Sequence, residues 1–311
     1  MEAQVRVIES ESGTLRDALL HGARVLLEAG IENGRLDAEV LLRHVLKVEP
    51  SELYINMDSP LDHGRKQQFR ELLAQRARLK PVAYITGRKE FWSLDFIVTP
   101  DVLIPRPATE VVVEIALQQL RRSGQQHLLK GLDLGTGSGA IAICLAKECA
   151  GIEIKAVDIS SRALAVARLN SERHGLAKRI QFLRGDLFEP VAGEEESFDL
   201  IVSNPPYVRK GELPTIAPGV REWEPMLALD GGVDGLDFYR RIIGRAHEYL
   251  TVGGHIVLEI GADMAKSVAA LFSAAGCYAP ICVYQDYAGW DRVIAATKLL
   301  PHVAWQGMKR G

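Results

Sequence analysis

From about residue 130 onward, the sequence alternates short apolar runs with longer segments of helical periodicity. Such alternation is typical of a doubly wound α/β fold, in which helices cover both faces of a mostly parallel sheet. The last two apolar runs are joined only by residues 285–290, too few for a parallel crossover, so we expect these strands to pair antiparallel. Strands are predicted at 130–134, 153–157, 180–184, 198–203, 254–260, 280–284 and 291–296, and helices at 139–148, 161–173, 235–250 and 264–274.

The first eighty residues carry helical periodicity and predict a small N-terminal domain of three helices. Thr14 can cap the first helix, which we expect to run to about Glu28 and to stop at Gly30. The second helix should end before Pro50, and Asp62 should open the third. The residues expected to face the core of this domain are Leu15, Ala18, Leu19, Val25, Leu26, Leu36, Val40, Leu41, Val45, Leu46, Phe69, Leu72 and Leu73.

The third predicted helix has a basic face opposite its apolar one. Such a face is either a solvated surface or a docking surface for an acidic partner or a phosphate backbone, and the sequence leaves both open. On the second interpretation the N-terminal domain docks the substrate. The basic residues are Arg65, Lys66, Arg70, Arg76, Arg78 and Lys80.

Residues 81–107 are interpreted as a connector that holds a short β-hairpin. Its strands are expected at 90–92 and 96–98, with the turn at Ser93-Leu94. Pro105-Arg106-Pro107 then stiffens the entry to the next helix. The predicted domains are therefore 1–80, a connector over 81–107 and a larger domain over 108–311.

Composition and charge exclude several classes of protein. A net charge of −3 and a pI near 6.3 argue against a dedicated nucleic-acid binder, so no stable nucleic-acid partner is expected. No apolar run reaches membrane-spanning length, and Met1-Glu2-Ala3-Gln4 does not begin an export signal, which predicts a cytoplasmic protein without a membrane partner. A monomer is expected. The cysteines, Cys144, Cys149, Cys277 and Cys282, lack the spacing of metal ligands, and no metal site is predicted.

A glycine turn, residues 135–139, joins the strand at 130–134 to the helix that follows. Its glycines allow a sharp turn and a close approach to a ligand, and the helix start offers free N–H groups to an anion. This pattern fits a nicotinamide dinucleotide and S-adenosylmethionine equally well. Asp158 ends the next strand, where it can accept hydrogen bonds from ribose hydroxyls or else cap the following helix. After the third strand, Asp186 is placed to meet an adenine amino group and Leu187 to cover the ring.

The fourth strand ends in Asn204-Pro205-Pro206-Tyr207, which we call the acceptor turn. Asn204 and Pro205 each precede a proline, which favours extended backbone, and neither proline has an N–H to donate. The Asn204 Oδ1 and the Pro205 carbonyl can each accept one hydrogen from a planar amino group, while Tyr207 can pack on that group's face. The alternative is a rigid turn without chemistry. A dehydrogenase gives no role to the acceptor turn, whereas a methyltransferase explains all four strand ends.

From about residue 14 to 296 the chain resembles the HemK-type protein-(glutamine N5) methyltransferases, which modify class I peptide chain release factors, the proteins of translation termination. One position departs from the family pattern: Ala108 stands where the family usually has an acidic residue. The segments that carry the resemblance are 34–39, 81–87, 102–110, 135–139, 185–190, 203–207, 224–225, 228–232, 234–239 and 286–293.

The resemblance implies an S-adenosylmethionine-dependent methyltransferase fold, and transfer of the cofactor's methyl group to the glutamine of the GGQ motif of a release factor. It leaves as alternatives a glutamine methyltransferase acting on a ribosomal protein, an N6-adenine or N4-cytosine nucleic-acid methyltransferase, and a non-catalytic nucleotide-binding module. Residues 208–233, which follow the acceptor turn, are expected to form a lid on the substrate side. The residues implied are Asn204, Pro205 and Tyr207 for catalysis, these with Pro206 and Arg106 for substrate binding, and Asp133, Gly135, Thr136, Gly137, Ser138, Gly139, Asp158, Asp186, Leu187, Asn204, Thr109 and Glu110 for cofactor binding.

Overall fold

A computed structural model describes residues 13–122 and 128–300, and the chain divides into two units between Thr86 and Gly87. The first twelve residues, from which no export signal was predicted, lie outside the described residues, as do residues 301–311. Among the residues that are described, no helix is both long enough and apolar enough to cross a membrane.

The N-terminal unit is helical, as predicted, and contains more helices than expected. Thr14 accepts a hydrogen bond from the Asp17 N–H and Asp62 accepts one from the Arg65 N–H, so both predicted caps are confirmed. The end of the second helix before Pro50 is also confirmed, but Pro50 itself opens a short third helix that the sequence analysis missed, since proline is well suited to a first helical turn. The helices are α1 (Leu15–Glu28), α2 (Gly34–Leu46), α3 (Pro50–Ile55), α4 (His63–Ala77) and α5 (Val82–Thr86).

Two assignments in this unit were wrong. Leu36 is 59% exposed, because Ala38 and Leu41 form the buried face of α2 and Leu36 points away from it. Arg76 does not belong to a solvated basic face: its Nε donates to Asp37 Oδ2 at 2.7 Å, and both side chains are largely buried. This pair fastens α4 to α2.

The β-hairpin begins the second unit, with β1 (Arg88–Phe91) pairing antiparallel with β2 (Leu94–Ile97). Its turn falls at Trp92 and Ser93, one residue earlier than predicted. Both have positive φ, 54° and 55°, as a two-residue hairpin turn of this hand requires. The chain then enters a single 3-10 turn, η1 (Pro107–Thr109), and helix α6 (Glu110–Arg122).

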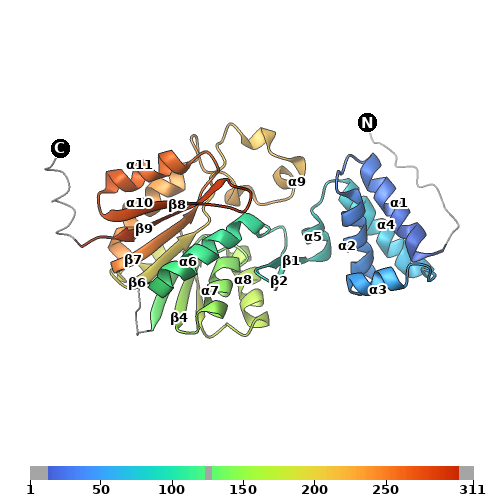
Figure 1. The fold of residues 1–311 in the computed structure, drawn as a ribbon, viewed down its shortest axis with the longest axis horizontal. Helices are drawn as coiled ribbons and strands as arrows, with labels where there is room; N and C mark the ends of the chain where they lie inside the picture. Colours follow the sequence, from blue (N-terminus) through green and yellow to red (C-terminus); the bar gives the residue numbers. More distant parts are fainter. Residues whose placement is uncertain (1–12, 123–127, 301–311) are drawn as a thin grey trace. The chain divides into compact units, whose positions relative to one another are not determined.

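Seven strands form one sheet in the order β5-β4-β3-β6-β7-β9-β8 (Figure 1). Strands β5 to β7 are parallel, whereas β9 runs antiparallel to both β7 and β8, which confirms the predicted mostly parallel sheet with an antiparallel last strand. The strands are β3 (Leu129–Leu134), β4 (Ile152–Asp158), β5 (Ile180–Arg184), β6 (Phe198–Ser203), β7 (Leu250–Glu259), β8 (Tyr278–Gln285) and β9 (Asp291–Lys298).

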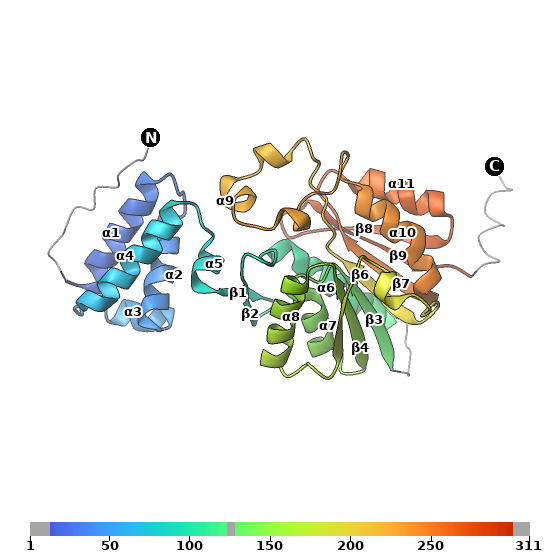
Figure 2. The same cartoon turned by 180° about the vertical axis from the view of Figure 1, so that it is seen from behind.

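Helices cover both faces of this sheet, as Figure 2 shows from behind. Helix α6 packs with α7 (Ala140–Glu148) over one apolar cluster, and α8 (Ser161–Arg173) lies beside α7 against β4 and β5. On the other face, α10 (Asp237–Tyr249) packs with α11 (Ala265–Ala275) over a second apolar cluster. The chain order reverses between the neighbouring strands β3 and β6. Open α/β sheets bind ligands beyond the carboxyl ends of the strands at such a reversal.

Residues 208–233 contain three single-turn helices: η3 (Leu213–Thr215), α9 (Pro218–Arg221) and η4 (Met226–Ala228). The two ends of this loop lie together, because Val208 and Asp230 form a parallel bridge directly after the acceptor turn. The loop is therefore fastened to the end of β6.

Candidate active site

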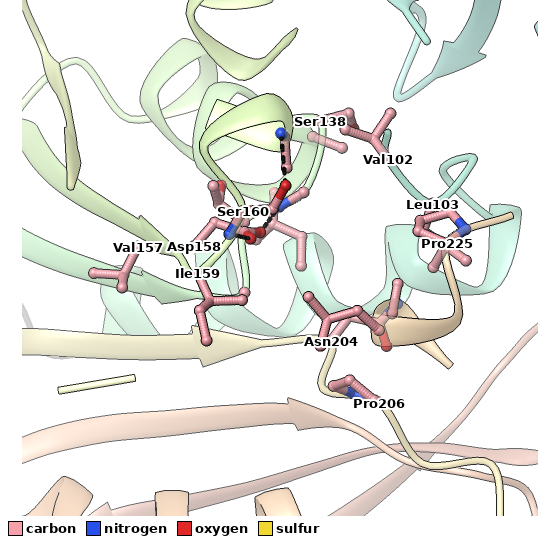
Figure 3. A pocket seen from close by; sticks show the side chains of 18 of the residues that line it. Val102, Leu103, Ser138, Val157, Asp158, Ile159, Ser160, Asn204, Pro206 and Pro225 are labelled. Atoms are coloured by element: carbon pink, nitrogen blue, oxygen red, sulfur yellow. Dashed lines mark hydrogen bonds between the residues drawn. The ribbon is translucent and has the colours of Figure 1, made fainter. Parts of the chain in front are cut away.

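A cavity of about 390 Å³ lies beyond the carboxyl ends of β3, β4, β5 and β6. Figure 3 shows Asp158 and Ser160 on one side of it, and Asn204 and Pro206 on another. The fold thus brings together side chains from all four predicted strand ends. The predicted site residues that line the cavity are Arg106, Thr109, Gly135, Thr136, Gly137, Ser138, Asp158, Asp186, Leu187, Asn204 and Pro206.

The backbone conformation of the glycine turn requires glycine at three positions. Gly135, Gly137 and Gly139 have φ of +73°, +57° and +82°, which other residues rarely adopt. The Gly137 N–H donates to Asp158 Oδ2 at 2.9 Å and the Ser160 N–H donates to Asp158 Oδ1 at 2.9 Å (Figure 3). The cap of α8 is the Ser160 hydroxyl, so Asp158 is not the N-cap residue and fastens the glycine turn to β4.

Asp133 lies beneath the glycine turn and is fully buried, with 0% exposure. Burial raises the pKa of its carboxyl to about 7. Its Oδ2 accepts a hydrogen bond from Thr136 Oγ1 at 2.6 Å, and within the described part of the chain its Oδ1 has no partner. Asp133 therefore holds a residue of the cavity wall without lining the cavity itself.

At the end of β5, Asp186 Oδ2 accepts a hydrogen bond from Arg241 Nη2 at 2.6 Å. Arg241 and Phe238 come from α10, and both line the cavity beside Leu187. The sequence analysis named neither of these α10 residues. The Asp186 Oδ1 accepts no hydrogen bond from the described residues, so it is available to accept from an amino group.

The carboxamide of Asn204 is joined to a buried carboxyl. Asn204 Nδ2 donates to Thr109 Oγ1 at 3.2 Å, and Thr109 Oγ1 donates to Glu259 Oε2 at 2.6 Å. Tyr207 Oη donates to Glu259 Oε1 over a long 3.5 Å. Burial raises the pKa of Glu259 to about 7 and that of Tyr207 to about 12.

Sequence reasoning missed Glu259, which is 1% exposed at the end of β7. The sequence feature that could have identified it is an acidic residue inside the apolar run 256–260. The sequence analysis also gave no role to Glu224, whose side chain is 1% exposed. Glu224 accepts from Arg106 Nη2 at 2.5 Å and from the Ile104 N–H at 3.2 Å, and so fastens the loop 208–233 to the segment before η1.

Not all predicted site residues reach the cavity wall. Glu110 turns toward the hairpin instead, where its Oε1 accepts from the Trp92 N–H at 2.7 Å. Arg106 does line the cavity, but Glu224 already pairs with its guanidinium. The predicted residues that do not line the cavity are Asp133, Gly139, Pro205, Tyr207 and Glu110.

Comparison with known proteins places this geometry in a family. The model of the PrmC N-terminal domain matches residues 17–87, and that of the methyltransferase small domain matches residues 109–217. The release factor glutamine methyltransferase of Geobacter sulfurreducens is 45% identical over 284 residues, which cover 91% of this chain and 96% of that protein. The chain belongs to the release factor glutamine methyltransferase family.

Other comparisons agree with this assignment. The release factor glutamine methyltransferase of Moorella thermoacetica is 43% identical over 283 residues, covering 91% of this chain and 98% of that protein. Among solved structures, the hMettl16 catalytic domain in complex with MAT2A 3′UTR hairpin 6 matches with a TM-score of 0.53 and 16% identity, over 74% of this chain and 82% of that one. The structural likeness confirms the predicted methyltransferase fold, and family membership decides against the dehydrogenase interpretation of the glycine turn.

Proposed function

We propose that this protein transfers the methyl group of S-adenosylmethionine to the side-chain amide nitrogen of the glutamine in the GGQ motif of class I peptide chain release factors. The observation that carries the proposal is the shared cavity: Asn204 of the acceptor turn and the glycine turn line the same space, in a member of this family. The names of the relatives favour a release factor over a ribosomal protein or a nucleic acid as the substrate.

The residues of the cavity fit the cofactor. Its volume of about 390 Å³ suits a small-molecule site, for which about 300–1,000 Å³ is usual. The glycine turn and the start of α7 present N–H groups to the carboxylate, Asp158 can accept from the ribose, and Asp186 with Leu187 can hold the adenine. When bound, S-adenosylmethionine supplies an electrophilic methyl group on a sulfonium.

The acceptor turn compensates for the low reactivity of the nucleophile, the amide nitrogen of the substrate glutamine. A carboxamide nitrogen is a poor nucleophile because its lone pair is delocalised into the carbonyl. Asn204 Oδ1 and the Pro205 carbonyl accept its two hydrogens, and these bonds strengthen as the N–H groups become more acidic, so they stabilise the transition state more than the ground state. Positioning of this kind can contribute about 7–11 kcal/mol. Water can remove the proton that the nitrogen loses.

The wider setting of the reaction is part of the proposal. The enzyme acts as a cytoplasmic monomer, without a membrane or a stable nucleic-acid partner. The N-terminal domain, 1–80, docks the release factor, while the connector over 81–107 leads to the methyltransferase domain over 108–311. The loop 208–233 forms a lid over the substrate.

The test is to incubate the protein with labelled S-adenosylmethionine and purified release factor, and to locate the label by peptide mapping. We expect it on the GGQ glutamine alone. Asn204→Ala should lower kcat by about 10²–10³-fold, the usual cost of removing one preorganised transition-state contact, with cofactor affinity within a few-fold of wild type. Label found only on DNA or only on a ribosomal protein would overturn the proposal.

A further inference from the structure

Resting on the proposed function, we infer that Thr109 and Glu259 are positioning residues that set the direction in which the Asn204 carboxamide faces. They do so through a hydrogen-bond relay, Asn204 to Thr109 to Glu259. The relay joins three elements that are distant in sequence: the end of β6, the 3-10 turn η1 and the end of β7.

The relay is buried and well formed at its inner end. Glu259 is 1% exposed and Thr109 is 4% exposed, and the distance between Glu259 Oε2 and Thr109 Oγ1 is 2.6 Å. A buried carboxyl is retained only at a cost unless its oxygens are hydrogen-bonded. Here Thr109 satisfies one oxygen closely, and Tyr207 approaches the other at 3.5 Å.

Which group donates and which accepts along the relay follows from the number of hydrogens that each group carries. A threonine hydroxyl has one hydrogen, and an ionised carboxylate can only accept, so Thr109 must donate to Glu259. The Thr109 oxygen is then left as an acceptor, and it can be satisfied only by the Nδ2 end of Asn204.

This direction matters because an asparagine carboxamide is nearly symmetric in shape. Without a partner that distinguishes its two ends, Nδ2 could face the substrate as easily as Oδ1. With Nδ2 held by Thr109, the Asn204 Oδ1 is the end left for the substrate amide, and it accepts no hydrogen bond from other described residues. A turned carboxamide would present N–H groups to the N–H groups of the substrate.

The relay also predicts how transfer depends on pH. The ionisable groups that face Glu259 are Tyr207, Tyr239 from α10, Arg106, and Arg292 from β9. Arginine side chains stay charged in proteins, and burial raises the pKa of both tyrosines further above neutrality, so the Glu259 carboxyl is the member of this group that titrates near pH 7. A protonated carboxyl can donate to Thr109 and reverse the relay, so kcat should rise with pH through about 7.

The experiment compares four variants of the full chain. Thr109→Val removes the hydroxyl, Thr109→Ser restores one, and Glu259→Gln places an amide where either end can meet Thr109. Thr251→Val is the matched control, because this hydroxyl lies at the opposite end of the sheet, where it donates to the Phe198 carbonyl at 3.3 Å. For each variant, kcat and KM for the release factor, the cofactor Kd and the pH profile are measured.

Thr109→Val and Glu259→Gln should lower kcat by about 10- to 100-fold, the rate equivalent of one unsatisfied buried polar group. KM for the release factor should change by less than about three-fold in both variants, the cofactor Kd should be unchanged in Glu259→Gln, and the rise of kcat near pH 7 should disappear. Thr109→Ser should recover most of the kcat lost in Thr109→Val. A Thr109→Val enzyme that keeps more than half of the wild-type kcat, or a wild-type pH profile in Glu259→Gln, would overturn the inference.

A second readout separates this inference from the proposed function. The side-chain amide signals of Asn204 are identified in ¹H–¹⁵N spectra by their loss in Asn204→Ala. They should shift in Thr109→Val and Glu259→Gln but not in Thr251→Val. If wild-type protein transfers no methyl to release factors while these shifts occur, the proposed function fails and the relay stands; if the signals do not move, the relay itself is wrong.

Discussion

Replacing Gly231 by alanine should disturb the acceptor turn while leaving the cofactor side of the cavity intact. Gly231 is buried at the end of the loop 208–233, and its N–H donates to the Val208 carbonyl at 2.9 Å. A Cβ on Gly231 would lie 2.7 Å from the Tyr207 Cα and 2.9 Å from the Pro206 carbonyl oxygen. These are backbone atoms of the acceptor turn, which cannot rotate away as a side chain can.

The size of the effect follows from that overlap. Moving the Tyr207 Cα from 2.7 Å to the 3.4 Å of an ordinary contact requires a shift of about 0.7 Å. A misplacement of about 1 Å in an active site can lower a rate by about 10²-fold. We therefore expect Gly231→Ala to lower kcat by about 10- to 100-fold, equivalent to about 1.4–2.7 kcal/mol of activation free energy.

The assay is steady-state methyl transfer to the release factor, with cofactor affinity measured by titration calorimetry. Gly211→Ala is the matched control, because Gly211 lies in the same loop and an added Cβ there meets no atom within 4 Å. We expect Gly211→Ala to behave as wild type and both variants to bind the cofactor normally. Wild-type kcat in Gly231→Ala would refute the argument that this close contact holds the acceptor turn in place.

Three further predictions concern other contacts. Asp158→Ala should weaken S-adenosylmethionine binding, since it removes the proposed ribose acceptor and releases the glycine turn, and normal affinity in titration calorimetry would contradict this. Asp37→Ala should lower the free energy of unfolding of the helical unit by about 1–3 kcal/mol in urea titrations of the full chain, because Arg76 loses its largely buried partner; an unchanged transition would show that the pair is not stabilising. Burial raises the pKa of Glu259 from 4.5 to about 7. Between these two pH values the folded state keeps a proton that the unfolded state releases. The stability that this proton contributes is therefore fully present below about pH 4.5 and is lost as the pH rises through 7. Urea titrations at pH 5 and pH 8 measure how far the free energy of unfolding falls between these two pH values. This fall should be smaller in Glu259→Gln than in wild type by about 3 kcal/mol, and an equal fall in both proteins would be evidence against the raised pKa.

The sequence predicted the sheet well because each of its strands is an apolar run with clear ends. Strand β6 has the predicted bounds, and β7 begins at Leu250 instead of residue 254 because it continues across a register shift, where Leu250 pairs with Phe198. Local chemistry also predicted the caps at Thr14 and Asp62. It failed at Pro50, since a proline can follow one helix and open the next with equal ease.

The site was predictable only where its residues follow strands directly. The strand ends converge because parallel strands place their carboxyl ends at one edge, so the cavity could be expected from the pattern alone. The partners behind those residues could not be found in this way. Thr109 and Glu259 are 150 residues apart, and Ile104 and Glu224 are 120 apart; such pairs depend on how side chains pack, which no spacing records.

Two of the buried carboxyls, those of Asp133 and Glu259, share one arrangement. Asp133 accepts from the Thr136 hydroxyl and Glu259 accepts from the Thr109 hydroxyl, each at 2.6 Å, and both threonines line the cavity. Each carboxyl takes the only hydrogen of its threonine, so each threonine oxygen can act only as an acceptor. Burying these carboxyls lowers stability at neutral pH, because the charged form is poorly solvated. The fold therefore gives up stability at two points to fix the polarity of two cavity-lining groups, and Asn204 is held through one of them.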